Sequence, residues 1–239
     1  MKTKASILII SSLTALSIGS SSCSKSENSL FGRIPTIYEE QMVEFAESVK
    51  DLNLDDQGDI RANAENALVV LAGMQASFQK AEEKAKPLAE GMVGKTVPYT
   101  VSDSLPYQIV SDIKVEKVLL PAMSLTWRGG KTTRLKIAFD AVFTQKQDRQ
   151  VNMYFFIMSG DQPVGYDEIW KYGMKNTGDT LHVQTTVDAP DIPSEYLETC
   201  DELLFVTPYT FETNKKSIIK QQKEWNEAFE KKLGLNEDK

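Results

Sequence analysis

The clearest pattern in the chain is the stretch Leu135-Lys136-Ile137-Ala138-Phe139-Asp140-Ala141-Val142-Phe143. Its odd-numbered residues are all apolar, whereas Lys136 and Asp140 occupy even-numbered positions. Successive side chains of a β-strand point to opposite faces of the sheet, so this alternation predicts a strand with one buried face. The stretch therefore indicates a sheet that packs against a core on one side.

Several other short stretches between residues 96 and 212 show strand-like patterns. Strands are expected around residues 113–115, 151–157, 166–172, 181–187 and 203–206. We interpret residues 146–149 as a hairpin turn and residues 159–161 as the end of the strand expected over residues 151–157. About six or seven short strands of this kind favour an antiparallel β-sandwich of immunoglobulin-like size. A curled sheet packed on helices is the alternative.

Helical patterns lie on both sides of this β-region. Thr36 and Glu39 have the spacing of a capping box, which predicts a helix start, and a second helix is expected from Ile60 to about Lys86, limited by Pro87. These two helices would form a hairpin over residues 35–90. A third helix is expected over residues 213–234. We therefore predict an α+β fold: a single module, residues 35–239, with the sandwich over residues 96–212 flanked by helices.

The first 22 residues have the layout of an export signal. Lys2 and Lys4 give a positive start, a short apolar segment covers residues 7–18, and small residues lead into Cys23. The apolar segment is too short and too rich in serine for a stable transmembrane helix. We therefore expect residues 1–22 to be a signal peptide and the protein to act outside the cytoplasm.

This segment resembles the signal of bacterial lipoproteins, in particular those of Bacteroides-like bacteria. The resemblance implies cleavage before Cys23 and a lipid on that cysteine, although Ser20 stands where such signals usually carry leucine. Residues 23–34 would then be the lipidated cysteine and polar tether of an outer-membrane lipoprotein that faces either the periplasm or the cell surface. Ordinary signal cleavage after Ser22, without a lipid, is the alternative.

The composition argues against some classes of partner. The chain carries 27 basic and 34 acidic residues, which gives a formal charge of −7. Removing residues 1–22 removes two lysines and no acid, so the mature charge is 25 − 34 = −9. Nucleic-acid binding needs clustered Lys and Arg to neutralise phosphates, so we expect no nucleic-acid partner.

Two segments come close to ligand-binding motifs without completing them. Residues 89–96 match a relaxed phosphate-loop pattern, but a helix and Pro87 precede them where a strand is required. Residues 53–60 match part of a calcium-binding loop, but Ala64 replaces the glutamate that should supply the bidentate ligand. We therefore expect no nucleotide, metal or other cofactor.

Nucleophilic catalysis is not indicated by the cysteine and histidine residues. Cys200 is followed by Asp201 and Glu202, and nearby acids raise the pKa of a thiol and lower its reactivity. The single histidine, His182, lacks the partners of a zinc site or of a recognisable catalytic triad. We expect Cys200 to be structural and the protein not to be an enzyme.

One aromatic row is a candidate binding surface. Tyr166, Trp170 and Tyr172 share one parity with Glu168, so a strand would place them on one face, and Trp127 could extend the row. Aromatic rings beside a carboxylate form a suitable platform for sugar rings. The alternative is that these rings fill the core or the contact between sheet and helix.

These observations predict a lipid-anchored cell-envelope protein that acts as a non-catalytic binding or accessory subunit. Its partner would be an envelope protein. The alternatives are a glycan-binding surface lipoprotein that uses the aromatic row and, with less support, a hydrolase that uses a pair of carboxylates.

Overall fold

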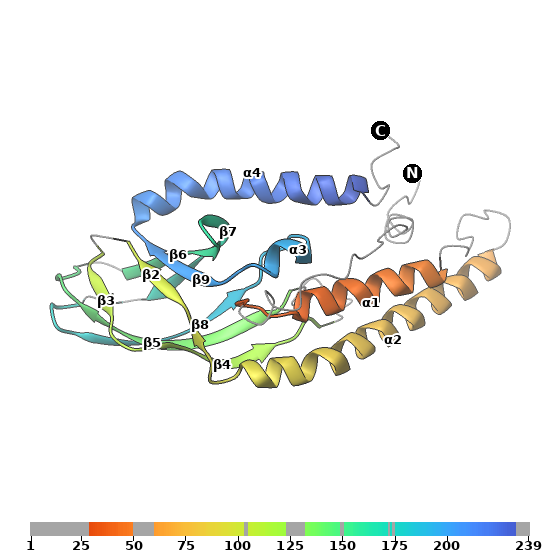
Figure 1. Cartoon of the computed structure of the whole chain (residues 1–239), viewed down its shortest axis with the longest axis horizontal. Coiled ribbons are helices and arrows are strands. Elements are labelled where there is room, and N and C mark those ends of the chain that lie inside the picture. Colours follow the sequence, from red (N-terminus) through yellow and green to blue (C-terminus); the bar gives the residue numbers. More distant parts are fainter. Residues whose placement is uncertain are drawn as a thin grey trace.

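The computed structural model describes residues 29–49, 60–102, 105–122, 132–148, 151–171, 173 and 175–232. The predicted signal peptide, Cys23, residues 53–59, Trp127 and Tyr172 lie outside these residues. The described residues form an α+β fold with a helical hairpin, two sheets packed together and a long C-terminal helix (Figure 1). The predicted fold class is confirmed. Within the described ranges, no helix is both long and apolar enough to cross a membrane.

Two sheets form the sandwich. The first sheet has the order β1–β4–β5–β3, and β8 pairs along the other edge of β5. The second sheet has the order β2–β9–β6–β7, with β2 and β9 parallel and the other neighbours antiparallel. The strands are β1 Thr96–Val97, β2 Tyr99–Val101, β3 Tyr107–Ile109, β4 Ile113–Leu119, β5 Arg134–Phe143, β6 Val151–Ser159, β7 Gln162–Lys171, β8 Thr180–Asp188 and β9 Glu202–Val206.

The main core lies between the two sheets. The odd-numbered residues of the alternating stretch on β5 are all buried, as predicted: Leu135, Ile137, Phe139, Ala141 and Phe143. The Phe139 ring meets Phe205 of β9 edge-on at 5.7 Å, which joins the first sheet to the second. Alternation on β5 therefore identified correctly which face of this strand is inside.

The outer face of the second sheet carries a second, smaller core under helix α4 (Pro208–Lys232). Phe211 of α4 stacks on Phe156 at 5.8 Å and lies 4.7 Å from the ring of Tyr154. Ile218, two turns further along the helix, is also buried there. Figure 1 shows α4 lying across this side of the sandwich.

The helical hairpin consists of α1 (Ile34–Val49) and α2 (Ile60–Met92), which pack against each other. The predicted capping box is wrong, because Thr36 and Glu39 lie inside α1 and bind elsewhere. Thr36 Oγ1 donates to Glu198 Oε1 at 3.0 Å, and Glu39 Oε2 accepts the Ser194 N–H at 2.9 Å. The two side chains thus fasten α1 to the short helix α3 (Ser194–Leu197).

Three predicted boundaries are corrected by the structure. Pro87 lies within α2, which continues to Met92, so this proline does not end the helix. Residues 146–149 are not a hairpin turn, because β5 and β6 belong to different sheets. The third helix begins at Pro208 rather than near residue 213. At this start, Thr207 Oγ1 accepts the Thr210 N–H. Proline is favoured at the first helical position because no N–H is needed there.

The folded part also begins before residue 35. Leu30, Phe31 and Ile34 are buried in the main core. Ser29 Oγ donates to the Leu197 carbonyl at 2.7 Å, and the Leu30 N–H donates to the Cys200 carbonyl. The polar stretch available as a tether after Cys23 therefore ends at about Ser29.

Candidate functional site: a groove between α2 and β4

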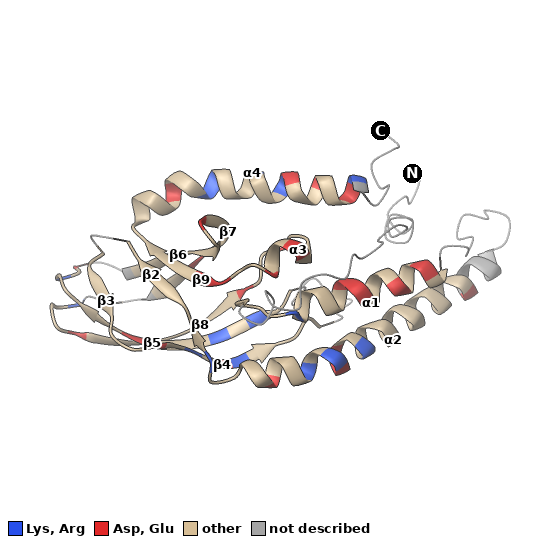
Figure 2. Cartoon of the chain, viewed as in Figure 1, with Lys and Arg blue, Asp and Glu red and all other residues tan. Residues whose placement is uncertain are grey.

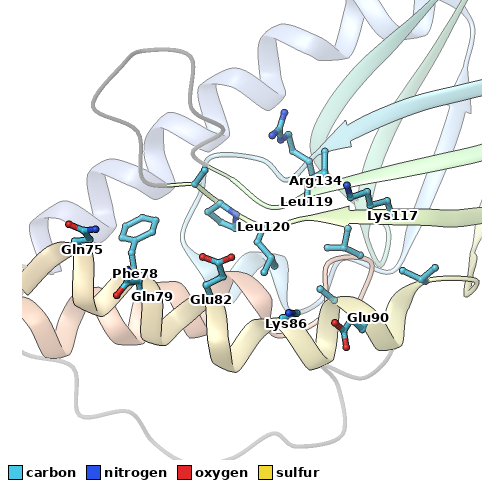
Figure 3. Close-up of a pocket in the computed structure, with 15 residues that line it drawn as sticks. Gln75, Phe78, Gln79, Glu82, Lys86, Glu90, Lys117, Leu119, Leu120 and Arg134 are labelled. Carbon is cyan, nitrogen blue, oxygen red and sulfur yellow. The ribbon is translucent and has the colours of Figure 1, made fainter.

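A groove with a volume of about 730 Å³ separates the second half of α2 from the end of β4 (Figure 3). In Figure 3, Phe78 and Glu82 rise from α2 toward Leu120, which follows β4. Its apolar lining includes Phe78, Val93, Val118, Leu119, Leu120 and Pro121. The volume lies in the range of sites that hold small ligands or a short peptide segment.

The spacing of residues on α2 explains why one side of this helix faces the groove. Gln75, Gln79, Glu82, Lys86 and Glu90 follow one another at intervals of three or four residues, so they form one stripe of the helix. A second stripe consists of small residues, Ala81 and Ala85, which are buried in the core. Small side chains let the helix pack closely against the body of the protein and leave the polar stripe on the groove side.

Basic side chains dominate the sheet side of the groove. Lys117 comes from β4, and Arg134 begins β5, where it pairs in register with Leu119. The Nε atom of Arg134 is buried and has no hydrogen-bond partner. A buried donor without a partner costs free energy, so this N–H is suited to donate a hydrogen bond to a ligand oxygen.

The charges around the groove are not neutralised by ion pairs within the part of the chain that the structure describes. No salt bridge there involves Lys86, Lys117 or Arg134. Figure 2 shows basic residues on β4, both basic and acidic residues on the second half of α2, and acids on α1. An acidic chain therefore presents basic side chains on the strand side of this groove, opposite the mixed charges of α2.

Tyr38 of α1 contacts Phe78 of α2, and its pKa is sensitive to burial and to the charge of Glu82 on the groove wall. Its ring meets Phe78 edge-on at 5.6 Å, and its hydroxyl is buried without a hydrogen-bond partner. Burial raises the pKa of Tyr38 to about 12, and the negative charge of Glu82 adds to this increase. The phenol therefore stays neutral, so the charged groups of the groove are the carboxylates and basic side chains along its walls.

The predicted aromatic row is divided by α4. Tyr166 lies under the helix, with Phe211 edge-on at 5.8 Å and Lys215 Nζ 5.1 Å from its ring centroid. Trp170 lies on the same face of β7 but is 53% exposed. Its register partner Asn152 donates from Nδ2 to the Tyr154 hydroxyl at 3.2 Å. Of the four predicted residues, Tyr166 and Trp170 are described, and they lie in different environments.

The residues considered for catalysis are dispersed over the fold. Cys200 is fully buried, and burial together with Asp201 raises its pKa to about 12. His182 lies on the outer face of the first sheet, where its Nδ1 is 2.7 Å from Asp140 Oδ1. In the described ranges, no three His, Cys, Asp or Glu residues are grouped so as to hold a metal ion.

The adjacent acids Asp167 and Glu168 point to opposite faces of β7. Asp167 pairs in register with the buried Phe155, whereas Glu168 pairs with Tyr154 on the outer face. Burial raises the pKa of Asp167, and the negative charge of Asp188 raises it further. The hydrogen bond that Asp167 accepts from the Glu168 N–H at 2.8 Å lowers this pKa by a smaller amount. As the alternation of a strand predicts, these two carboxylates do not act as a pair.

Comparison with known proteins gives no relative: no protein family, curated protein or solved structure matches the chain. The groove was not predicted from the sequence. The one available signal was the polar stripe on α2, which by itself is typical of any solvated helix face. Its partner wall on β4 and β5 lies about 30 to 60 residues further along the chain.

Proposed function

We propose that this protein is a non-catalytic, lipid-anchored binding or accessory subunit of the cell envelope, and that it holds its partner in the groove between α2 and β4. The observation that carries the proposal is the combination of an apolar lining with the basic side chains Lys117 and Arg134, which lack ion-pair partners in the described residues. Apolar contact supplies affinity, and the charged rim supplies orientation.

The export signal and Cys23 support the location of this function. A lipid on Cys23 would hold the folded part, which begins at Ser29, close to a membrane. Partners in the same membrane would then be met at a high effective concentration, so a shallow groove could be sufficient for stable binding. An intact mass of the mature protein without lipid would remove the anchor from the proposal.

Site-specific photocrosslinking in cells tests the groove directly. A photoreactive amino acid replaces Gln79, which lines the groove, or Gln184, which is exposed on the outer face of the first sheet. We expect one partner, at near-stoichiometric yield, from position 79 and from a second groove position at Gln75, but not from position 184. Equal capture at position 184, or turnover of a cell-wall substrate by residues 24–239, would contradict the proposal.

A second candidate function is glycan binding at Trp170. The specific observation is that Trp170 is 53% exposed beside the Asn152 amide and the Tyr154 hydroxyl, so one ring and two polar groups are placed together. A glycan array would test it, with Trp170→Ala expected to abolish any signal. Because Trp225 stacks on Tyr196 instead, Trp225→Ala is the matched control that should retain binding. Binding that survives Trp170→Ala would exclude this surface.

A further inference from the structure

The edge of β4 beside the groove is open. β1 pairs with β4 only at Ile113 and Lys114, and backbone bonds from Gly94 and Lys95 extend this contact to Val115. From Lys117 to Leu119, the pairing of β4 within the described residues is with β5 alone. On an edge strand, every second residue turns its N–H and C=O away from the neighbouring strand, and the outward groups of Lys117–Leu119 have no backbone partner among the described residues.

Helix α2 contacts β4, and the groove lies between the second half of the helix and the end of the strand. The groove between them is lined by Gln79, Glu82 and Lys86 on the helix side and by Lys117–Ala122 on the strand side (Figure 3). A further strand would lie about 4.8 Å from β4, between the two walls. The groove therefore has the requirements for strand addition: an unpaired edge, an apolar wall for alternate side chains, and restricted access.

We propose that the groove binds an extended, acidic peptide segment of a partner protein, which adds to the first sheet as a strand along β4. This inference rests on the proposed function and specifies the chemistry of the partner. Backbone hydrogen bonds to β4 supply affinity for an extended chain. Alternate apolar side chains of the segment contact Phe78 and Leu120, and carboxylates contact Lys117 and Arg134.

Charge complementarity determines the acidic character of the segment. Both charged residues on the strand side of the groove are basic, and the Arg134 Nε atom is buried without a hydrogen-bond partner. A carboxylate is the group that an arginine binds best, because two of its donors match two oxygens. The acids Glu82 and Glu90 lie on the opposite wall, on α2, and among the described residues no ion pair joins them to Lys117 or Arg134.

Edge strands usually carry features that prevent them from pairing with another chain, and these features do not block the Lys117–Leu119 stretch of β4. β4 has a register irregularity between Val115 and Lys117, and such bulges discourage pairing. The irregularity lies before the groove, and register with β5 is regular from Lys117 to Leu119. A lysine on an edge strand also discourages pairing with an equally basic or apolar strand. It favours an acidic one, which gives the site selectivity.

The test uses the mature chain, residues 24–239, and a displayed library of random peptides of about 12 residues, which span about 40 Å when extended. We expect selected peptides to combine acidic residues with alternating apolar residues. Lys117→Glu combined with Arg134→Glu should weaken their binding at least tenfold. Lys114→Glu is the matched control, since Lys114 lies on the same strand but already pairs with β1, and it should change binding less than twofold.

Backbone methylation of the selected peptide distinguishes strand addition from other modes and does not depend on the folding of a protein variant. N-methylation at alternate residues should abolish binding at one parity and leave it intact at the other, because alternate N–H groups face β4. Binding at the groove that is indifferent to methylation parity, or selection of amphipathic helical peptides, would overturn the strand proposal while leaving the proposed function standing. Selected peptides that photocrosslink to position 184 rather than position 79 would overturn both.

Discussion

The two outer faces of the sandwich are built differently. The outer face of the second sheet carries Tyr154, Phe156 and Tyr166, and α4 covers them with Phe211. The outer face of the first sheet is polar, with Gln184 donating to Glu116 at 2.9 Å and His182 next to Asp140. A strand such as β6, apolar on both faces, requires two covers. A strand such as β5, apolar mainly on one face, requires one.

Removing the cover should have the largest effect on stability. Phe211→Ala removes a fully buried ring between α4 and the second sheet, and truncation of a buried phenylalanine costs about 3–5 kcal/mol. Urea denaturation would measure the loss. Ile219→Ala on the same helix is the control, because Ile219 is exposed and its truncation should change the free energy of unfolding little. Similar losses in both variants would show that α4 contributes only as a helix, not through this contact.

The far half of α4 is fastened by a smaller contact. The Trp225 ring stacks on the ring of Tyr196 in α3, with 4.1 Å between centroids, and Asn226 Nδ2 donates to the Asp191 carbonyl at 2.9 Å. Trp225→Ala should cost about 1–3 kcal/mol, less than Phe211→Ala, because both rings remain partly accessible to water. Hydrogen exchange should show loss of protection in the second half of α4 and retained protection around Phe211. Uniform loss along the whole helix would mean that the two contacts act as one unit.

A carboxylate that faces the core should differ from those on the outer faces. Burial raises the pKa of Asp167, so its protonated form stabilises the folded state, and this contribution is lost as pH rises through the raised pKa. Asp167→Asn keeps an acceptor for the Glu168 N–H and removes the charge. It should therefore raise the free energy of unfolding at pH 7, with the gain disappearing toward pH 3. A gain that is independent of pH would contradict this explanation.

The smallest effect is expected on the open polar face. The His182 and Asp140 side chains are 63% and 42% exposed, and ion pairs at such sites contribute about 0–1 kcal/mol. His182→Ala should lower the free energy of unfolding by about 0.5 kcal/mol or less, and added salt should remove the difference. Thermal unfolding at low and at high salt would measure it. A loss as large as that of Phe211→Ala would show that this face has a cover outside the described residues.

Sequence patterns predicted the strands better than the way the strands associate. β5 shows its buried face through alternation, and the Gly160 turn between β6 and β7 was marked by its residues. The crossing of the chain between β5 and β6, which belong to different sheets, was missed, because a polar turn has the same composition whether it reverses the chain or leads to another sheet. Thr36 and Glu39 were misread for a related reason: their partners, Glu198 and Ser194, are more than 150 residues away.

The candidate site could be predicted even less. The groove exists only because α2 lies beside the edge of β4, where Lys117, Leu120 and Arg134 line it. No local spacing in the sequence predicts that arrangement. Trp170 and Tyr166 were correctly placed on one face of a strand. Which of the two is covered depends on where α4 begins: the helix starts at Pro208, two residues after the end of β9, and this start brings Phe211 over Tyr166. Local periodicity identifies faces, whereas the neighbours of each face are set by the tertiary fold.

The early start of the folded part limits how far this protein could reach from a membrane. Ser29 lies six residues after Cys23 in the sequence. Ser29 and Leu30 are hydrogen-bonded to the segment around Leu197 and Cys200. Six residues span about 20 Å at full extension. If Cys23 carries a lipid, the end of the fold near α3 stays within that distance of the bilayer. A tether this short would restrict the protein to partners whose binding segments lie close to the lipid headgroups.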